Sequence, residues 1–391
     1  RRWTRPTSRS PYHDSSVAVG GLSTARGPRY TGSMSRLPPF EPDLARASTL
    51  PAFAYTDADV FAEERTKIFA RTWQPVGAAE DVRAPGSYFT AELASAPVVV
   101  TRDAAGVLRG FYNVCRHRAG PVAIGKGTRR SLTCRYHGWT YGLDGALVST
   151  PELGAVEGFD RTCHGLRPVR VEQWGPLVFA NLAPDAAPLS SVLGDIPRAT
   201  APYALEAMRV VERREYVIRC NWKVYVDNFL EGYHLPTVHP SLYRELDYDA
   251  YRVETFDLYS SQIAPLRPAK PGTPGRQYTE DGEGALYYWV FPNWMLNIYP
   301  DNMSLNVVVP LGLDETLTLF EWYRPEPVDP AAVAKTVAFS DEIQREDIAI
   351  CESVQKGLAS GAYDTGRFSA LRENGVHHFQ QLVHAYLTGA R

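Results

Sequence analysis

The sequence has few cysteines and no long apolar run. Five cysteines among 391 residues are too few, and odd in number, for a disulfide framework, so we interpret the thiols as metal ligands or buried groups in a reducing compartment. No stretch approaches the roughly 18–20 consecutive apolar residues that cross a bilayer, and no apolar segment follows the basic N-terminus as in a secretory signal. We therefore expect a soluble, cytoplasmic protein without a membrane partner.

An excess of positive charge is also missing. The 41 Lys and Arg residues are balanced by 44 Asp and Glu residues, which gives a formal net charge of −3. Without a basic field, nucleic acid is not an expected partner. The G-x-G-x-x-G fingerprint of dinucleotide-binding domains is absent too, so the chain is not expected to bind a nicotinamide cofactor directly.

Length and local composition divide the chain into four segments. At 391 residues it exceeds the roughly 250–300 at which one core stops growing, so two folded units are expected. Residues 1–48 are rich in Arg, Ser, Gly and Pro and are expected to form a flexible arm, in which residues 1–33 are an upstream extension or an expression-vector remnant. A helical lead-in to the second unit (49–72), a β-rich unit (73–182) and an α+β unit (183–391) follow.

Periodicity predicts several individual elements. Asp57 is the expected N-cap of a helix that reaches Ala70, with Phe69 outside its apolar face. Further helices are expected over residues 222–233 and 331–358, and the Pro- and Gly-rich residues 265–275 are expected to form a loop.

Cys115, His117, Cys134 and His137 form the pattern C-x-H-x16-C-x2-H. Each half supplies one thiolate and one imidazole, a donor set that binds either one structural zinc ion or a [2Fe-2S] cluster with Cys on one iron and His on the other. Gly and Pro next to these pairs predict two turning loops rather than the strand and helix of a zinc finger, which favours the cluster. The remaining cysteines are expected to be free and buried: Cys163, Cys220 and Cys351.

A second candidate metal site begins at Glu231. This residue and His234 are three positions apart, hence neighbours on one helical face. His239 is five residues past His234, which on an undisturbed helix would place the two rings about 140° apart. Pro236 predicts a break between them, because it lacks an amide donor and clashes with the preceding turn. Two His and one carboxylate form the facial triad of a non-haem Fe(II) that activates O2.

The predicted helix over residues 331–358 supplies the candidates for that carboxylate. At about 100° per residue, one apolar stripe of this helix contains Phe339, Ile343, Ile350, Val354 and Leu358. Asp347 falls inside the stripe and Glu346 at its edge, while Asp341 and Glu352 point away. Because an acid in an apolar stripe needs a partner, we predict Asp347 as the ligand, with Glu346 as the alternative.

The segments NVCRHRAG and CRYHGW resemble the cluster loops of the Rieske non-haem iron oxygenases, and the likeness runs from about residue 73 to the end. The resemblance implies that Cys115 and Cys134 hold one iron of a [2Fe-2S] cluster while His117 and His137 hold the other. It also implies an α+β fold, with an antiparallel β Rieske domain and a helix-grip catalytic domain built on a curved antiparallel sheet.

In this family the iron site reads carboxylate-x-x-His-x4-His, which falls on Glu231, His234 and His239, and the later ligand matches Asp347. The resemblance implies that Glu231 bridges a cluster His of one subunit and an iron-ligand His of the next in a homotrimer. The alternative is that Glu231 only orients His234 within its own subunit; Asp227 is a weaker candidate for the same position. O2 would be the co-substrate, and electrons would come from NAD(P)H through a separate reductase, with or without a ferredoxin.

The region of the second triad is more similar to choline, glycine betaine and carnitine monooxygenases than to ring-hydroxylating dioxygenases. This resemblance implies hydroxylation or N-dealkylation of a small quaternary-ammonium substrate, whose trimethylammonium group suits aromatic rings. The same rings could surround an aromatic hydrocarbon, so a ring-hydroxylating dioxygenase is the alternative. A non-catalytic electron-transfer or zinc-stabilised protein is a third hypothesis, which predicts that the triad does not converge. The rings in question are Tyr287, Tyr288, Trp289, Phe291, Trp294, Tyr299, Phe320, Trp322 and Tyr323.

Overall fold

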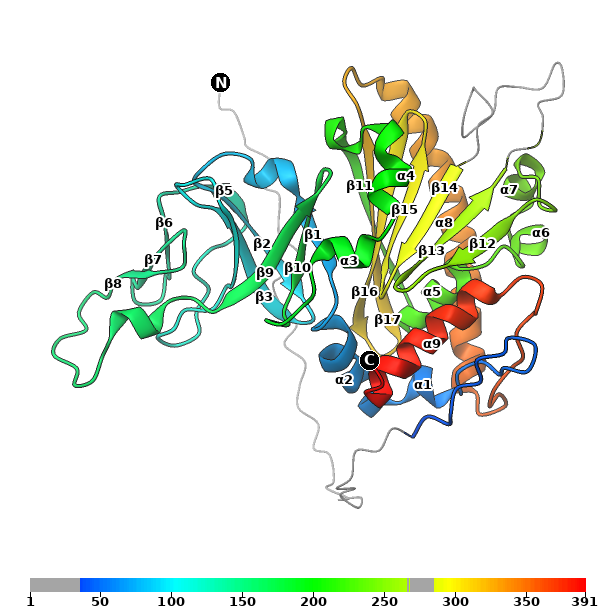
Figure 1. The fold of residues 1–391 in the computed structure, drawn as a ribbon, viewed down its shortest axis with the longest axis horizontal. Coiled ribbons are helices and arrows are strands. Elements are labelled where there is room, and N and C mark those ends of the chain that lie inside the picture. Colours follow the sequence, from blue (N-terminus) through cyan, green and yellow to red (C-terminus); the bar gives the residue numbers. More distant parts are fainter. Residues whose placement is uncertain (1–35, 266, 268–284) are drawn as a thin grey trace, which may run out of the picture. The chain divides into compact units, whose positions relative to one another are not determined.

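The computed structural model describes residues 36–265, 267 and 285–391 (Figure 1). The interpretation of residues 1–33 and most of the loop expected over 265–275 lie outside this part of the chain. No helix among the described residues is long and apolar enough to cross a membrane.

The first large sheet is antiparallel, with seven strands in the order β1-β10-β9-β4-β3-β2-β5. Its strands are β1 (Gln74–Ala78), β2 (Ser87–Leu93), β3 (Ala96–Arg102), β4 (Leu108–Tyr112), β5 (Lys126–Thr128), β9 (Pro168–Trp174) and β10 (Leu177–Asn181). A small sheet adds β6 (Ser131–Thr133), β7 (Thr140–Gly142) and β8 (Leu147–Ser149). Val98, Val99 and Val100 are fully buried and alternate between two cores, as the two-residue period of a strand requires.

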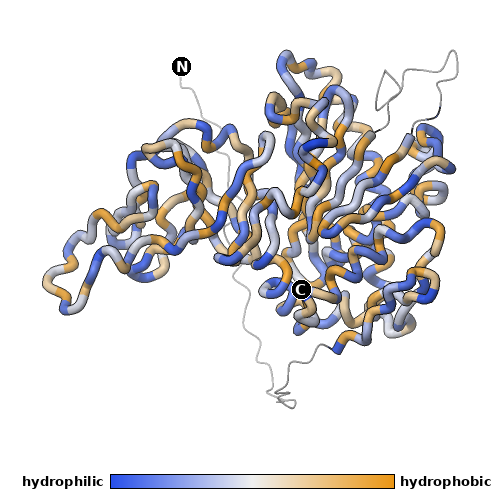
Figure 2. Tube along the Cα trace, viewed as in Figure 1, coloured by the Kyte–Doolittle hydropathy of each residue, from blue (hydrophilic) through white to orange (hydrophobic). Residues whose placement is uncertain are grey.

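The second large sheet is also antiparallel and has seven strands in the order β11-β17-β16-β15-β14-β13-β12. They are β11 (Arg209–Ile218), β12 (Arg252–Thr255), β13 (Tyr259–Ala264), β14 (Ala285–Val290), β15 (Trp294–Tyr299), β16 (Asn302–Gly312) and β17 (Glu315–Arg324). Apolar residues recur along the strands of both large sheets (Figure 2). On β15, Leu296 and Ile298 enter a large apolar core, whereas Asn297 faces the other side. The expected α+β fold with antiparallel sheets is thus confirmed.

Helices complete the α+β part (Figure 1). They are α1 (Phe53–Thr56), α2 (Ala58–Glu64), α3 (Leu189–Leu193), α4 (Ile196–Thr200), α5 (Trp222–Phe229), α6 (Leu235–Val238), α7 (Pro240–Glu245), α8 (Pro330–Ala359) and α9 (Asn374–Thr388). Helix α8 is capped by Asp329, whose side chain accepts a hydrogen bond from the amide of Ala331 at 2.9 Å, and it begins with proline, a residue suited to the first turn. It packs against α5, α6 and β11.

The helix predicted from Asp57 exists, but its end differs from the prediction. Asp57 caps α2 by accepting hydrogen bonds from the amides of Asp59 and Val60, as expected. Residues 65–69 then form a π turn, and Phe69, predicted to lie off the apolar face, is only 2% exposed. In the π turn, backbone hydrogen bonds join residues five positions apart, so each residue rotates about the axis by less than in an α-helix. This change places Phe69 in the same apolar core as Ile68.

The stripe predicted on α8 is wrong at two positions. Asp341, expected to point away, is buried against β11, where it accepts hydrogen bonds from Arg214 and Tyr216. Val354, expected inside, is 44% exposed. A helix of 30 residues that meets different neighbours along its length does not keep one buried stripe. The prediction that Cys163 is buried is also wrong, since this residue lies on the surface of a short 3-10 turn.

A buried ion pair anchors α5. The side chains of Glu64 and Lys223 are both 0% exposed, and the Lys223 ammonium donates to Glu64 Oε1. Glu64 Oε2 accepts a hydrogen bond from Trp222 Nε1 at 2.7 Å. Burial lowers the pKa of Lys223, although the charge and hydrogen bond of Glu64 oppose this shift. The pair fixes the start of the segment that leads to the second metal site.

Lys223→Met should therefore destabilise the protein strongly. It leaves the Glu64 carboxylate buried without its cation, a change that costs about 3–5 kcal/mol of unfolding free energy. Denaturant titration would measure this loss. The double variant Glu64→Gln/Lys223→Met should recover much of it, since no lone charge remains.

Lys126→Met is the matched control, because Lys126 pairs with Asp81 at 2.7 Å but is 67% exposed. Exposed pairs contribute little, so this substitution should hardly change the denaturation midpoint. An equal loss in both single variants would contradict the role given to the buried pair.

Candidate metal centres

The four predicted cluster ligands lie on two loops, one after β4 and one between β6 and β7. Cys115 and Cys134 are 3% and 2% exposed, and burial together with the neighbouring Cys115 thiol raises the pKa of Cys134. His117 and His137 are exposed, and their ring centroids are 4.6 Å apart. The structure thus brings two sulfurs together inside and two imidazoles together outside.

Both loops close with the same backbone hydrogen bond. The amide of Ala119 donates to the carbonyl of Cys115 at 3.0 Å, and the amide of Gly138 donates to that of Cys134 at 2.9 Å. Ala119 and Gly138 both have positive φ, at 59° and 74°. At Gly120, a Cβ would lie only 3.0 Å from the Cys134 sulfur, which explains the need for glycine beside the thiol.

This paired arrangement fits two metal ions rather than one. Among the described residues, the one group with three ligand atoms all within 4.8 Å of each other is elsewhere, so these four donors do not converge as a tetrahedral zinc site would. Partial desolvation of the ring, and next the charges of His117 and Arg118, lower the pKa of His137 and favour the neutral ring that binds metal. The donor set suits a cluster with sulfur ligands on one iron and nitrogen ligands on the other.

The break before the second site lies earlier than predicted. Helix α5 ends at Phe229 rather than continuing to residue 233, so Glu231 and His234 lie on a turn and not on a helix. Pro236 lies in the first turn of the new helix α6, which starts at Leu235, instead of ending the old helix, because a proline in a first turn gives up no intrahelical hydrogen bond. His234 and His239 are the residues that flank this one-turn helix, and their ring centroids are 5.0 Å apart.

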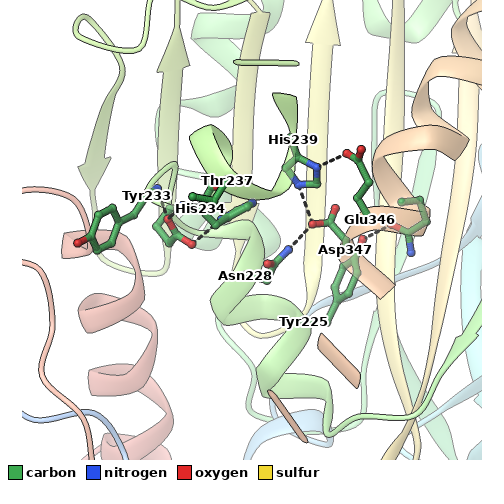
Figure 3. A network of polar contacts seen from close by, with 10 residues as sticks. Tyr225, Asn228, Tyr233, His234, Thr237, His239, Glu346 and Asp347 are labelled. Atoms are coloured by element: carbon green, nitrogen blue, oxygen red, sulfur yellow. Dashed lines mark hydrogen bonds and ion pairs between the residues drawn. The ribbon is translucent and has the colours of Figure 1, made fainter. Parts of the chain in front are cut away.

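His234, His239 and Asp347 do converge, with ligand atoms all within 4.8 Å of one another (Figure 3). His239 Nε2 lies 2.9 Å from Asp347 Oδ1, and this oxygen also accepts a hydrogen bond of 2.6 Å from Asn228 Nδ2. The side chains of the two His and the Asp are 16%, 2% and 13% exposed. Two imidazoles and one carboxylate at this spacing can hold a divalent iron with positions left open.

Two further acids hold the histidines from their other side. His234 Nδ1 lies 2.5 Å from Glu231 Oε1, and His239 Nδ1 lies 2.6 Å from Glu346 Oε2. Such carboxylates fix the tautomer and orientation of a metal-binding imidazole. Burial disfavours charge on His239, but the hydrogen bonds and charges of Asp347 and Glu346 outweigh it and raise its pKa. The neighbouring acids of α8 therefore contact opposite nitrogens of one ring.

Asp227 is engaged elsewhere. This half-buried carboxylate accepts hydrogen bonds from Tyr55 at 2.7 Å and from Gln380 at 3.1 Å, so it ties α5 to α1 and α9 rather than orienting His234. Burial raises the pKa of Asp227 to about 7, although the two hydrogen bonds oppose this shift.

The sequence pattern missed Asn228. This residue lies on the last turn of α5, and its amide holds the oxygen of Asp347 that faces His239 (Figure 3). Its position one turn before Glu231 was the only signal in the sequence. Sequence alone does not show that a residue on α5 meets one on α8, which lies 119 positions later.

A cavity of about 140 Å³ opens beside the triad. Four of the nine predicted aromatic residues line it, namely Tyr287, Tyr299, Phe320 and Trp322. The other five are in the apolar cores: Tyr288, Trp289, Phe291, Trp294 and Tyr323. Because His234, His239 and Asp347 converge, the third hypothesis, in which the triad does not converge, is wrong.

The fold and the two donor sets define an oxygenase with its own electron relay. Residues 72–160 match the family model for the Rieske [2Fe-2S] domain, and residues 205–389 match that for the ring-hydroxylating alpha subunit (catalytic domain). The chloroplastic choline monooxygenase of Arabidopsis thaliana is 37% identical over 87% of this chain and 83% of its own. The chain belongs to the Rieske non-haem iron oxygenases, as an oxygenase component.

Other relatives agree with this assignment. The carnitine monooxygenase oxygenase subunit of Escherichia coli (strain K12) is 31% identical over 86% of this chain and 93% of its own. A solved quaternary ammonium Rieske monooxygenase, described for carnitine oxidation and inter-subunit electron transfer, superposes with a TM-score of 0.81 at 28% identity, covering 90% of this chain and 100% of that one. Naphthalene 1,2-dioxygenase, at 21% identity and a TM-score of 0.70 over 87% and 92% of the two chains, shares the fold.

Enzymes of this family use a Rieske cluster, a mononuclear iron and O2, and the residues present fit both groups. When bound, the cluster supplies electrons and the mononuclear iron activates O2. The chain's own contribution is to hold each imidazole in one tautomer, through Glu231 for His234 and through Glu346 for His239.

Asp347→Asn and Glu346→Gln should separate the ligand from the orienting acid. We expect Asp347→Asn to keep the cluster iron, sulfide and visible spectrum but to lose the mononuclear iron. Glu346→Gln should keep a mononuclear site with metal affinity lowered about 10–100-fold. Iron and sulfide quantitation, followed by chelator competition, would measure both.

Glu342→Gln on the same helix is the control. This exposed acid contacts Ser241 at 2.9 Å and no imidazole, so its iron content should be unchanged. The opposite ranking, with iron lost in Glu346→Gln and kept in Asp347→Asn, would make Glu346 the ligand.

Proposed function

We propose that this chain is a terminal oxygenase that hydroxylates or N-dealkylates a quaternary-ammonium compound at an iron held by His234, His239 and Asp347. The observation that carries the proposal is the cavity beside the triad. Among its described lining residues are several aromatic rings and neither Lys nor Arg. A trimethylammonium group accepts no hydrogen bond and is best held by aromatic faces in the absence of competing cations.

Four of the aromatic rings that line the cavity form two pairs. Tyr287 and Tyr299 lie 6.1 Å apart at 87° on β14 and β15, and Phe320 and Trp322 lie 5.8 Å apart at 59° on β17. Burial raises the pKa of Tyr287, which keeps its phenol neutral. Relatives named for choline and for carnitine support the same class of substrate.

An aromatic hydrocarbon, the alternative substrate, fits the cavity less well. Its lining also contains Asn297, Ser304 and Asn306, which are each less than 10% exposed. A hydrocarbon forms no hydrogen bond with amide or hydroxyl groups, so it gains less from this wall than a polar substrate would.

Electron supply follows from the exposure of the cluster histidines. We propose that a separate NAD(P)H-dependent reductase, with or without a ferredoxin, delivers electrons to the cluster held by Cys115, His117, Cys134 and His137. The outward position of both imidazoles supports this. Electrons would then pass to the iron of the next subunit in a homotrimer, with Glu231 as the bridge. The expected cytoplasmic location stays a prediction, and the plant relatives are named chloroplastic.

Single-turnover oxidation tests the substrate class without the reductase. The holoenzyme would be reduced with dithionite, freed of excess reductant, and exposed to O2 with choline, glycine betaine, carnitine or naphthalene. We expect an oxidised or demethylated product from at least one ammonium compound and none from naphthalene, as measured by mass spectrometry and a formaldehyde assay. A naphthalene dihydrodiol without any ammonium product would refute the proposal.

Glu231→Gln tests the bridge. The glutamine oxygen can still accept a hydrogen bond from the His234 ring, but the substitution removes the negative charge between the two centres. Reoxidation of the reduced cluster by O2 with substrate should therefore slow at least about tenfold. Stopped-flow absorbance would measure the rate, and chelator competition would show whether iron affinity is kept. If the slower rate is explained by weakened iron binding, Glu231 only orients His234 and is not the bridge.

Mixed trimers provide the control for transfer between chains. Cys134→Ser chains should lack the cluster, and Asp347→Asn chains should lack the mononuclear iron, so each is inactive by itself. Co-expressed, the two chains should regain single turnover if electrons cross between subunits, and should stay inactive if they do not.

A further inference from the structure

Helix α5 ends where a side chain of the second sheet takes over its last carbonyl. In a continuing α-helix, the amide of Tyr233 would donate to the carbonyl of Phe229, four residues earlier. This amide donates instead to a carboxylate oxygen of Glu231. The Phe229 carbonyl accepts a hydrogen bond of 2.7 Å from Gln262 Nε2, on β13 and 33 positions later in the chain. Gln262 thus satisfies a carbonyl that the end of a helix leaves open.

The amide of Gln262 is itself held in one orientation. Its Oε1 accepts a hydrogen bond from the hydroxyl of Tyr251, which lies just before β12. Gln262 and Tyr251 are 5% and 9% exposed, and both line the cavity beside the triad. Because a backbone carbonyl can only accept, the amide nitrogen must face Phe229 and the amide oxygen must face Tyr251. The two side chains therefore act as one unit against the end of α5.

The turn between α5 and His234 is also enclosed by close backbone packing. A Cβ at Gly232 would lie only 2.8 Å from a ring carbon of Tyr251. A Cβ at Gly375, near the start of α9, would lie 2.5 Å from the carbonyl oxygen of Leu230. Glycine is needed where another group approaches the backbone this closely. The turn therefore has little room to move while Tyr251 stays in place.

The early end of α5 is what allows the two histidines to converge. On a helix continued through both residues, the rings of His234 and His239 would point about 140° apart, whereas their centroids are 5.0 Å apart in the structure. We infer that Gln262, oriented by Tyr251, ends α5 at Phe229 and thereby positions His234 for the iron. Gln262 is a positioning residue, since it acts through the helix end. The inference rests on the proposed function, because it assumes an iron at this triad.

Gln262→Met tests the inference, because it removes both hydrogen bonds of the amide and keeps a side chain of similar length. We expect the mononuclear iron of the anaerobic holoenzyme to bind about tenfold more weakly, the equivalent of about one lost hydrogen bond, while cluster iron and sulfide are unchanged. Chelator competition would measure the affinity. The EPR signal of the ferrous protein with nitric oxide should also change shape, because it reports the arrangement of ligands around the iron.

Gln74→Met is the matched control. Gln74 is also 5% exposed, and its Nε2 donates at 2.8 Å to the carbonyl of Phe69, the last residue of the π turn. Its Oε1 accepts a hydrogen bond from Asn293, as that of Gln262 does from Tyr251. Gln74 does not line the cavity beside the triad. Gln74→Met should therefore lower thermal stability to a similar extent and keep the iron affinity and EPR signal of the unsubstituted protein.

Tyr251→Phe is a milder variant that decides the question if Gln262→Met does not fold. It keeps the ring beside Gly232 but leaves the amide of Gln262 free to rotate, so iron should bind about threefold more weakly and the EPR signal should broaden. Iron affinity and an EPR signal equal to those of Gln74→Met in every folded variant would overturn the inference and leave the proposed function intact. An unsubstituted protein that binds no iron beyond the cluster would instead overturn the proposed function.

Discussion

The contact between His239 and Asp347 is the constraint on which the catalytic part depends. These residues are 108 positions apart, and their side chains lie within 2.9 Å only if α6 and α8 are fixed side by side. Tyr225 on α5 donates to Gln344 on α8 at 2.6 Å, and Asn228 on α5 holds Asp347 itself. The buried Glu64–Lys223 pair holds the start of α5 in turn. The packing of the core and the geometry of the iron site therefore depend on the same contacts.

The histidines of the two metal centres differ in their hydrogen-bond partners and in their exposure. The imidazoles of the triad each have a carboxylate on Nδ1, and His239 is 2% exposed. The cluster rings are exposed, and His117 stacks on Trp139 at 4.9 Å. A rigid, partly enclosed site suits chemistry that must exclude side reactions, whereas an exposed edge suits the exchange of electrons with a partner. The same residue type serves both purposes because its surroundings differ.

Local patterns could be predicted from the sequence, and contacts between distant segments could not. Cys115, His117, Cys134 and His137 could be grouped as candidate ligands from the sequence because each pair lies on one short loop. His234 and His239 were found by spacing, but the break was misplaced, since Pro236 lies in the first turn of a helix instead of ending one. Asn297 and Asn306 were not anticipated as cavity-lining residues, because their places in the wall depend on the register of β15 and β16, which no local signal encodes.

The one-turn helix α6 also limits how the chain can vary in length. Its four residues are flanked by His234 and His239, so one inserted residue would rotate the second ring by about 100° about the helix axis, away from Asp347. Most loops absorb such insertions, but this segment has no slack on either side, because Glu231 already holds His234 and α7 begins immediately after His239. Insertions and deletions in related chains should therefore occur elsewhere, and the number of residues between these two histidines should stay constant.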